Sequence, residues 1–305
     1  MISSIKLYFF GTGGSWPTQF RNTASIGIRV GEEAILFDCG EGTQTRIMRS
    51  SLSLMKIKRI FISHFHGDHF LGLPGLIQTM SLYGREEPLE IYGPSGASSI
   101  ISDLLSLGYY SLSFDISIKE MYDGTIVDFG DYTVQSYRAS HPVPALSFAF
   151  KEKDSFKFDE EKIKEKNVPR RMLEKIRKLG EINIDGRTIN IQELSSEMRK
   201  GRKISYSGDT RKDSHLVELF KDSTVLIHEA TGEMSLADKV RAYGHSTGKD
   251  AAEQALLSNS KKLILVHFSP RYNDVNPILS EAKQVFENTE IANDLMELEV
   301  KLSEV

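Results

Sequence analysis

The feature that most constrains this chain is a run of metal-binding side chains directly after a short apolar strand. Residues 60–62 are apolar and largely β-branched, which predicts a buried strand. The segment His64-Phe65-His66-Gly67-Asp68-His69 follows it. Side chains two residues apart share one face of an extended chain, and glycine permits a sharp turn. Because four such groups would be costly to desolvate without a cation, the segment predicts a metal site with room for two adjacent ions.

Three later strands are also expected to end close to a metal-binding side chain. They are predicted at 133–137, 204–206 and 263–266. Imidazole with a minority of carboxylate suits zinc first, and manganese or iron second. A carboxylate can bridge two cations, and a dinuclear site can activate water while it stabilises the leaving oxygen of a phosphoryl displacement. The predicted ligands are His64, His66, Asp68, His69, His141, Asp209 and His267.

A second pair of segments carries groups suited to proton transfer. They are His228-Glu229-Ala230-Thr231 and Gly244-His245-Ser246-Thr247-Gly248. A carboxylate bonded to an imidazole raises its proton affinity, so such a pair near a leaving alkoxide is a reasonable general acid. Without further information, a buried carboxylate at a strand end and a histidine at a helix N-cap are the favoured interpretation. His215 stands in a polar stretch, and we expect a surface position without a role.

The charge of the chain is unevenly distributed. The 305 residues have a net charge of −4, which argues against a generally basic nucleic-acid coat. Residues 162–178, however, carry eight basic and two acidic residues, so this insertion is +6 and the remainder is −10. Its helix-like pattern is interrupted by Pro169 and ends at Gly180. A charge run is usually a solvated helix face, and this pattern alone does not favour RNA binding over that interpretation.

Composition and length exclude several other classes. Strands and helices alternate along the chain, which favours an ordinary α/β fold. The single cysteine, Cys39, cannot form an intrachain disulfide. The N-terminus lacks a leader pattern, and no apolar run approaches the ~18 residues that span a bilayer. We therefore expect a soluble protein of a reducing, cytoplasmic compartment with no membrane association.

These motifs together resemble the metallo-β-lactamase superfamily and, within it, the ribonuclease Z family, whose members remove the 3′ trailer from precursor tRNA. The likeness runs almost from end to end and includes Ser207-Gly208-Asp209-Thr210 and His267-Phe268-Ser269-Pro270-Arg271-Tyr272. It implies an αββα sandwich, with residues 1–305 as a single catalytic domain. It also implies an inserted flexible arm at 152–200, with the basic core 162–178, as a tRNA-gripping exosite.

The resemblance also implies roles for the site residues. It predicts two zinc ions per subunit, with manganese as the other possible metal. Asp68 would orient the attacking water, and Glu229 with His245 would serve the leaving 3′ oxygen. The expected metal sets are His64, His66 and His141 for one ion, and Asp68, His69 and His267 for the other, with Asp209 as the bridge.

The expected partners are precursor tRNA and a second copy of the chain, because arms in this family commonly reach across a homodimer. The loop before Asn22 matches one associated with nucleotides just after the cut, but has Gln19 where lysine is usual. The arm has Val168-Pro169-Arg170-Arg171 and not the frequent Gly-Pro pair. The residues expected to contact RNA are Arg21, Asn22, Lys162, Lys164, Lys166, Arg170, Arg171, Lys175, Arg177 and Lys178.

Two other functions remain open on the sequence. A small-molecule phosphodiesterase or arylsulfatase of the same superfamily would use the same metal site without needing the arm. A non-catalytic RNA-binding protein would carry a degenerate site, and the intact ligand positions argue against it. We therefore predict a zinc-dependent endoribonuclease that leaves a 3′-hydroxyl on the tRNA.

Overall fold

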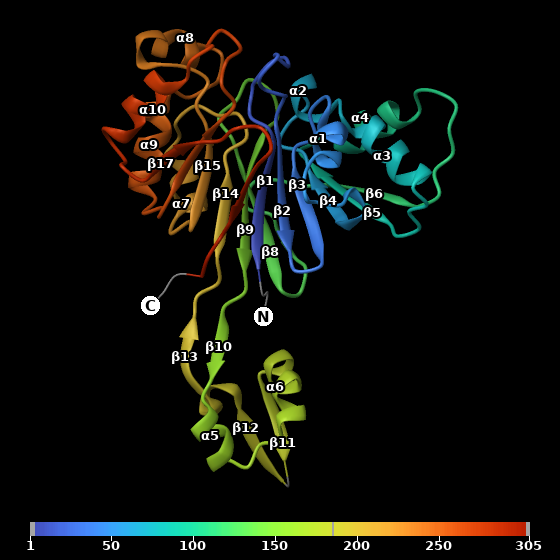
Figure 1. Ribbon diagram of the computed structural model, residues 1–305, viewed down its shortest axis with the longest axis vertical. Coiled ribbons are helices and arrows are strands. Elements are labelled where there is room, and N and C mark those ends of the chain that lie inside the picture. The colour runs from blue at the N-terminus through green and yellow to red at the C-terminus, as the bar shows by residue number, and fades with distance from the viewer. Residues whose placement is uncertain (1–3, 185, 303–305) are drawn as a thin grey trace.

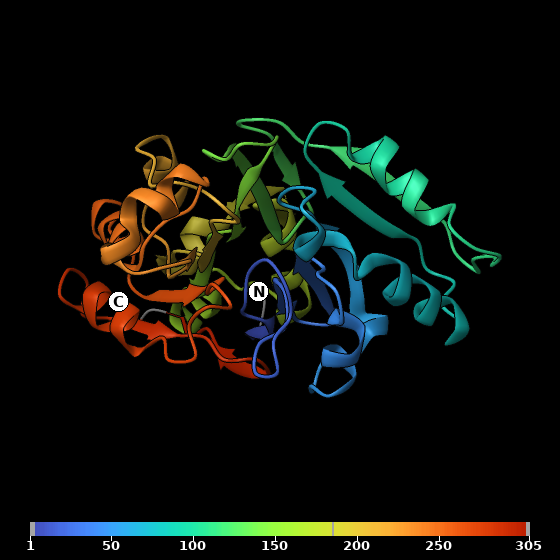
Figure 2. The same ribbon diagram turned by 90° about the horizontal axis from the view of Figure 1, so that it is seen from above.

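Two seven-stranded sheets lie face to face, with helices on both outer sides (Figures 1 and 2). This arrangement confirms the predicted αββα sandwich. The computed structural model describes residues 4–184 and 186–302, without the side chain of Lys178. Within these residues, no helix is both long and apolar enough to cross a bilayer.

The first sheet combines the N-terminal strands with one strand from the C-terminal end of the chain. Its order is β18-β1-β2-β3-β4-β5-β6, and β3 to β6 run parallel. The strands are β1 (Ile5–Gly11), β2 (Ser25–Val30), β3 (Glu33–Phe37), β4 (Ile57–Phe61), β5 (Leu89–Gly93), β6 (Ile116–Glu120) and β18 (Met296–Glu299).

The second sheet is built from the later half of the chain. Its order is β17-β16-β15-β14-β9-β8-β7, and β14 to β17 run parallel. The strands are β7 (Ile126–Asp128), β8 (Tyr132–Arg138), β9 (Leu146–Glu152), β14 (Lys203–Tyr206), β15 (Val225–Glu229), β16 (Leu263–Val266) and β17 (Thr289–Ile291).

Helices cover both outer faces, which explains why the strands are apolar on both sides. In β1, Leu7 and Phe9 belong to the core between the sheets, whereas Tyr8 and Phe10 pack in the layer below the helices. The helices of the first side are α1 (Thr43–Met48), α2 (Gly67–Phe70), α3 (Leu73–Leu82) and α4 (Ala97–Leu105), with η1 (Leu54–Lys56). Those of the second are α7 (His215–Phe220), α8 (Ala237–Ala242), α9 (Gly248–Leu257) and α10 (Asn276–Lys283), with η4 (Met234–Leu236).

Stacked aromatic rings join the two sheets at the centre of the sandwich. The ring of Phe37 in β3 stacks on Phe148 at 5.4 Å and on Tyr206 at 5.7 Å between centroids. Both partners belong to the second sheet. This packing brings the ends of the parallel strands of both sheets to one edge, where the predicted metal ligands follow them.

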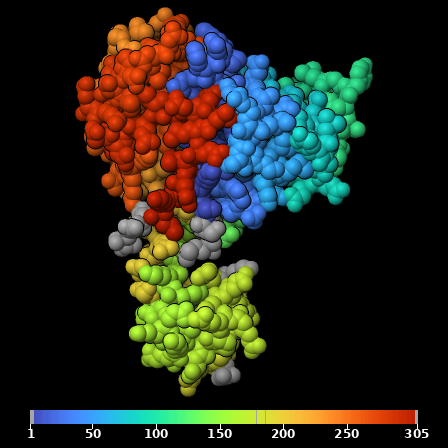
Figure 3. Space-filling view, viewed as in Figure 1, coloured from blue at the N-terminus to red at the C-terminus, as the bar shows by residue number. Residues whose placement is uncertain are grey.

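An arm extends from the body as a separate lobe between β9 and β14 (Figures 1 and 3). The paired strands β10 (Ser155–Phe158) and β13 (Ser195–Arg199) lead to it. Its other elements are α5 (Glu160–Glu165), η2 (Arg170–Met172), α6 (Leu173–Leu179), β11 (Glu181–Ile184), β12 (Arg187–Asn190) and η3 (Ile191–Leu194). Its own apolar core consists of Ile163, Val168, Ile176, Ile182, Ile189, Ile191 and Leu194.

A buried ion pair holds the base of the arm. Arg202 lies just before β14 and donates from Nε and Nη2 to the two carboxylate oxygens of Glu152, at 2.7 and 3.0 Å. Both side chains are buried. Gly201, directly before Arg202, has no room for a side chain, because a Cβ there would lie 1.9 Å from the carbonyl oxygen of Glu152.

Candidate metal centre

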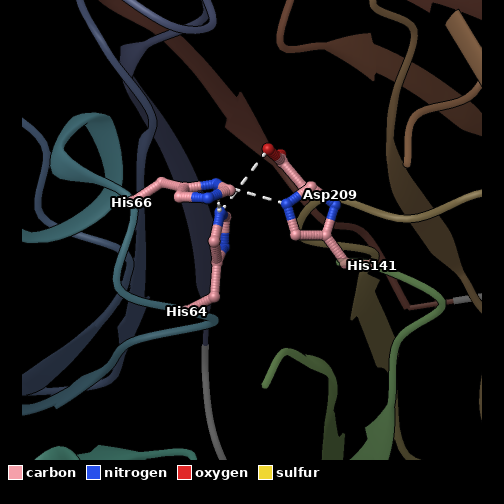
Figure 4. Close-up of side chains that lie close together, drawn as sticks. All are labelled: His64, His66, His141 and Asp209. Carbon is pink, nitrogen blue, oxygen red and sulfur yellow. Dashed lines mark hydrogen bonds and ion pairs between the residues drawn. The ribbon is translucent and has the colours of Figure 1, made fainter. Parts of the chain in front are cut away.

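The first predicted ligand set assembles at the edge between the two sheets (Figure 4). His64 and His66 follow β4, His141 lies between β8 and β9, and Asp209 follows β14. His66 Nδ1 lies 3.0 Å from His64 Nε2 and 3.2 Å from His141 Nε2. Asp209 Oδ2 is 3.7 Å from His64 Nε2. One ligand atom from each residue lies within 4.8 Å of the others, a spacing that suits a single cation.

The second set lies beside the first and shares Asp209 with it. Asp68 Oδ2 is 3.5 Å from His69 Nε2 and 3.4 Å from His267 Nε2. Asp209 faces His267 Nε2 with Oδ1 at 3.2 Å and His69 Nε2 with Oδ2 at 3.4 Å. Its two oxygens thus lie between the sets, as expected of a bridging carboxylate.

Within the described residues, several buried atoms of this centre make no hydrogen bond, which tests whether a metal fits. His69 Nε2, His267 Nε2 and Asp209 Oδ1 are buried without a hydrogen bond. Buried polar atoms without hydrogen bonds are costly, and all three belong to the second set or to Asp209, which the two sets share. A divalent cation would satisfy them.

The pKa shifts of the histidines also agree with a metal at this centre. Burial lowers the pKa of His64 well below its usual value, and it also lowers the pKa of His66. Neutral imidazoles are the form that binds metal. Burial opposes a charge on His69, yet the surrounding carboxylates outweigh it and raise the pKa of His69 well above its usual value. The centre therefore favours positive charge where the metals are expected.

Each of four histidines has one ring nitrogen held by a protein acceptor, which leaves the other for a metal. His141 Nδ1 donates to the carbonyl oxygen of Gly244 at 3.0 Å. His267 Nδ1 lies 3.1 Å from the hydroxyl of Thr231. The other two contacts are His64 Nδ1 to Ser63 Oγ at 3.0 Å and His69 Nδ1 to Asp38 Oδ2 at 2.8 Å.

Asp38 contacts a predicted metal ligand, and the sequence did not single it out. It follows β3 with a left-handed φ of +59°, and it is fully buried. Its Oδ1 accepts from the backbone N–H of Ser63 at 2.7 Å. Its Oδ2 accepts from Tyr206 at 2.7 Å and from His69. The carboxylate therefore fixes the orientation of His69. Its position at a strand end, like that of Asp209, is the pattern that could have identified it.

The backbone around His267 is strained and closely packed. His267 has a φ of +60°, which is uncommon for a residue other than glycine. Gly14 packs against its ring, and a Cβ at Gly14 would lie 2.5 Å from the ring carbon Cε1. Strain of this kind persists where surrounding structure enforces it, and it concentrates at functional sites.

Glu229 and His245 form the predicted pair. Glu229 is fully buried at the end of β15, and its Oε1 lies 3.0 Å from His245 Nδ1. The N-cap interpretation of His245 is wrong, because the side chain of Thr247 caps α9 by accepting from the N–H of Asp250. Burial opposes a charge on His245, but Glu229 overcomes it and raises the pKa of His245 to about 9. This imidazole lies 3.7 Å from Asp209 Oδ2, at the metal centre.

Arg21 and Asn22 hold their own loop in place. Arg21 Nη1 donates to Thr12 Oγ1 at 2.6 Å and to the carbonyl oxygen of Ala292 at 2.8 Å. Asn22 is buried and donates to the carbonyl oxygen of Glu41 at 2.6 Å. Their contact with RNA stays a prediction.

The basic residues of the arm divide into two groups. Lys162 donates to the carbonyl oxygen of Ser195 at 2.7 Å. Lys166 pairs with Glu193 and Arg170 with Glu160, while Arg177 lies over the ring of Phe158. The side chain of Lys178 lies outside the described residues. Among the basic residues expected to contact RNA, the exposed Lys164, Arg171 and Lys175 have neither a salt bridge nor a ring contact within the described part of the chain.

Comparisons with known proteins identify the family. The family model described as "Anti-Pycsar protein Apyc1" matches residues 5–176, slightly more than half of the chain. Ribonuclease Z of Thermoplasma volcanium is 45% identical over 99% of this chain and 99% of its own. Ribonuclease Z of Thermoplasma acidophilum is 44% identical over 99% and 98%. The chain belongs to the ribonuclease Z family. Over residues 5–176 it also belongs to the family of the Apyc1 model.

Solved structures agree with membership in the ribonuclease Z family. The short form of human tRNase Z matches with a TM-score of 0.71 and 30% identity, over 97% of this chain and 99% of that chain. The metallo-β-lactamase fold protein YhfI of Bacillus subtilis has the same TM-score at 17% identity, over 97% and 99%, which is a likeness of fold alone.

Proposed function

We propose that this chain is a zinc-dependent endoribonuclease that removes the 3′ trailer from precursor tRNA and leaves a 3′-hydroxyl on the tRNA. The observation that carries the proposal is the assembly of five histidines and two aspartates at one edge of the sandwich, beside the Glu229–His245 pair. It occurs in a chain that aligns with Ribonuclease Z relatives over nearly its whole length.

The proposed site would hold two divalent ions. When bound, these ions would supply Lewis-acid activation of water and neutralise charge on the phosphate. Zinc suits the histidine-rich donor set best, and manganese is the other metal to test. One ion would be held by His64, His66 and His141, the other by Asp68, His69 and His267, and both by Asp209.

The side chains then have distinct tasks. Asp68 would orient the attacking water, since its Oδ2 is fixed by the backbone N–H of Ser15 at 2.6 Å. In the metal-free protein burial opposes a charge on His245, but Glu229 raises the pKa of His245 to about 9, so this pair is suited to hold a proton. With Nδ1 held by Glu229, its Nε2 is the atom that would donate a proton to the leaving 3′ oxygen.

The arm, residues 152–200, would grip the tRNA away from the cut. The exposed Lys164, Arg171 and Lys175 are suited to phosphate contacts that weaken as salt increases. We also propose that the protein is a homodimer, and light scattering of the purified protein would test this. We further propose a cytoplasmic location.

The experiment is incubation of the metal-loaded protein with a 3′-extended precursor tRNA, followed by mapping of the product ends with and without an encoded CCA. We expect cleavage near the discriminator base and a 3′-hydroxyl. The variant His66→Ala should abolish turnover far more than RNA binding, whereas His215→Ala, at the surface, should match the wild type. If the protein hydrolyses a linear phosphodiester but does not cleave the tRNA, precursor tRNA is not its substrate. Phosphodiester hydrolysis would still be its reaction.

The role of His245 has its own test. The variant His245→Ala should slow cleavage of precursor tRNA by roughly 10²- to 10⁴-fold, the range expected for loss of a general acid. The effect should be smaller on a nitrophenyl diester, whose leaving group needs no proton. Full activity of His245→Ala on precursor tRNA would rule out this role.

A further inference from the structure

A cavity of about 550 Å³ adjoins the metal centre and has aromatic residues that the proposed chemistry does not use. His66, Asp68 and His245 line it, which makes it the space where the cleaved phosphate would lie. Trp16 and Tyr243 line it as well. The question is what these two rings bind.

Trp16 is held at this cavity although much of its ring faces solvent. It is the only tryptophan of the chain, and 56% of it is exposed. Its backbone N–H donates to the carbonyl oxygen of Gly14 at 2.9 Å. The preceding Ser15 has a strained φ of +66° and is bonded to Asp68. The loop is therefore tied to a catalytic residue while it presents a large aromatic surface.

Tyr243 supplies a second aromatic surface from the other half of the chain. It directly follows α8, lies two residues before His245, and is 66% exposed. Exposed aromatic rings that lie together at one cavity indicate a binding site, whereas single exposed apolar residues are common on protein surfaces.

Two positively charged side chains also line the cavity. They are Lys239 and Arg271, and both are exposed. Within the described part of the chain, neither has a salt-bridge partner, so their charges are available to a ligand. Aromatic faces next to free cations are the combination that binds unpaired nucleotides, because any base can stack on a ring while its phosphate meets a cation.

We propose that Trp16 and Tyr243 stack on the unpaired bases that flank the cleaved phosphate, with Lys239 and Arg271 on the adjoining phosphates. Bases in a duplex are covered by their neighbours and cannot stack in this way. The cavity would therefore select a single-stranded 3′ end. This inference rests on the proposed function and states which part of the RNA enters the site.

The single tryptophan makes a direct binding test possible without catalysis. Metal-free protein is titrated with a precursor tRNA that has an unpaired 3′ extension, and with the same RNA ending at its last paired nucleotide. We expect quenching of the Trp16 fluorescence by the extended RNA only. Equal quenching by both RNAs, or none by either, would overturn the proposal.

Kinetics give a second measure. Stacking is worth ~1–3 kcal/mol per base, so Trp16→Ala and Tyr243→Ala should each lower kcat/KM on precursor tRNA by roughly 10-fold. The variant Trp16→Phe keeps an aromatic face and should stay within about 3-fold of the wild type. Tyr109→Ala removes a fully exposed ring outside this cavity and serves as the matched control.

The outcomes separate the two proposals. If the wild-type protein does not cleave precursor tRNA, the proposed function fails. If it does cleave, but Trp16→Ala has an unchanged kcat/KM and the two RNAs give the same fluorescence, only the stacking proposal fails.

Discussion

The carboxylate of Asp38 fixes the orientation of one metal ligand from within the core. Replacing Asp38 with Asn keeps the shape but removes the charge that faces His69 Nδ1 at 2.8 Å. Changes to such supporting groups typically reduce metal affinity or activity about 10- to 100-fold. We expect Asp38→Asn to fall in this range when metal content and turnover are measured together.

The matched control for that variant is Asp123→Asn. Asp123 also pairs with a histidine, His215, at 2.8 Å, but both side chains are exposed. The same chemical change should there leave metal content and turnover unaltered. Equal metal content and activity in Asp38→Asn and the wild type would contradict the role assigned to Asp38.

His245 gives a prediction for the pH dependence of stability in chelated, metal-free protein. Despite burial, Glu229 raises the pKa of His245 to about 9, above the value of ~6.5 expected when the chain is unfolded. The folded state therefore binds the proton more tightly. The resulting stabilisation is fully present below pH ~6.5 and is lost as the pH rises through about 9.

The measurement is the free energy of unfolding of chelated wild-type and His245→Gln proteins between pH 6 and pH 10, by chemical denaturation. The difference between them should shrink as the pH rises. A constant or growing difference would show that Glu229 does not hold a proton on His245.

At the scale of elements, the ion pair at the base of the arm should matter for stability. Replacing Arg202 with Met leaves Glu152 buried without its partner, and breaking a buried pair costs about 3–5 kcal/mol. Chemical denaturation measures this loss. Lys153→Met breaks an exposed pair with Asp128 and should cost at most ~1 kcal/mol. Similar losses in both variants would contradict this account.

The arm itself can be removed as a unit. Its apolar core is its own, and its two ends are adjacent, since the N–H of Glu152 donates to the carbonyl oxygen of Arg202 at 2.9 Å. Replacing residues 155–199 with a short glycine–serine linker should abolish tight binding of precursor tRNA and preserve hydrolysis of a small diester. Retained tRNA binding would contradict the exosite, and would favour the reading of the basic residues as a solvated surface.

The elements also show what the sequence could and could not reveal. The apolar strand before His64 and the helix break at Pro169 were predictable from local pattern. The strand β6 was not, because its residues are only half-buried and alternate weakly. The hairpin of β11 and β12 was hidden as well, since its apolar residues pack against the arm and not the main core.

At the scale of the whole molecule, the metal centre joins the two sheets. Four ligands follow β4 of the first sheet, and Asp209 and His267 follow β14 and β16 of the second. A ligand that binds only the folded state stabilises it, by about 4 kcal/mol at 1,000 times its Kd. Chelation should therefore lower the Tm by several degrees, and excess zinc should restore it. An unchanged Tm after verified metal removal would contradict two-sheet binding.

The site was predictable where several ligands cluster in one short segment, and less so where single residues meet across the fold. His141 and His267 gained plausibility only from that segment. Asp38 escaped notice because its partner Tyr206 stands 168 residues away. The hydrogen bond from Arg21 to the carbonyl oxygen of Ala292 also joins residues that are far apart in the sequence, so no local pattern reveals it.

His267 is the last of the seven predicted ligands along the chain, so it sets when the centre can assemble during synthesis. The histidine-rich segment after β4 is translated early, but β16 and the residues that complete both ligand sets are translated late. The strand β18, which pairs with β1, follows later still. A growing chain on the ribosome therefore lacks a complete second ligand set until β16 and His267 have been made.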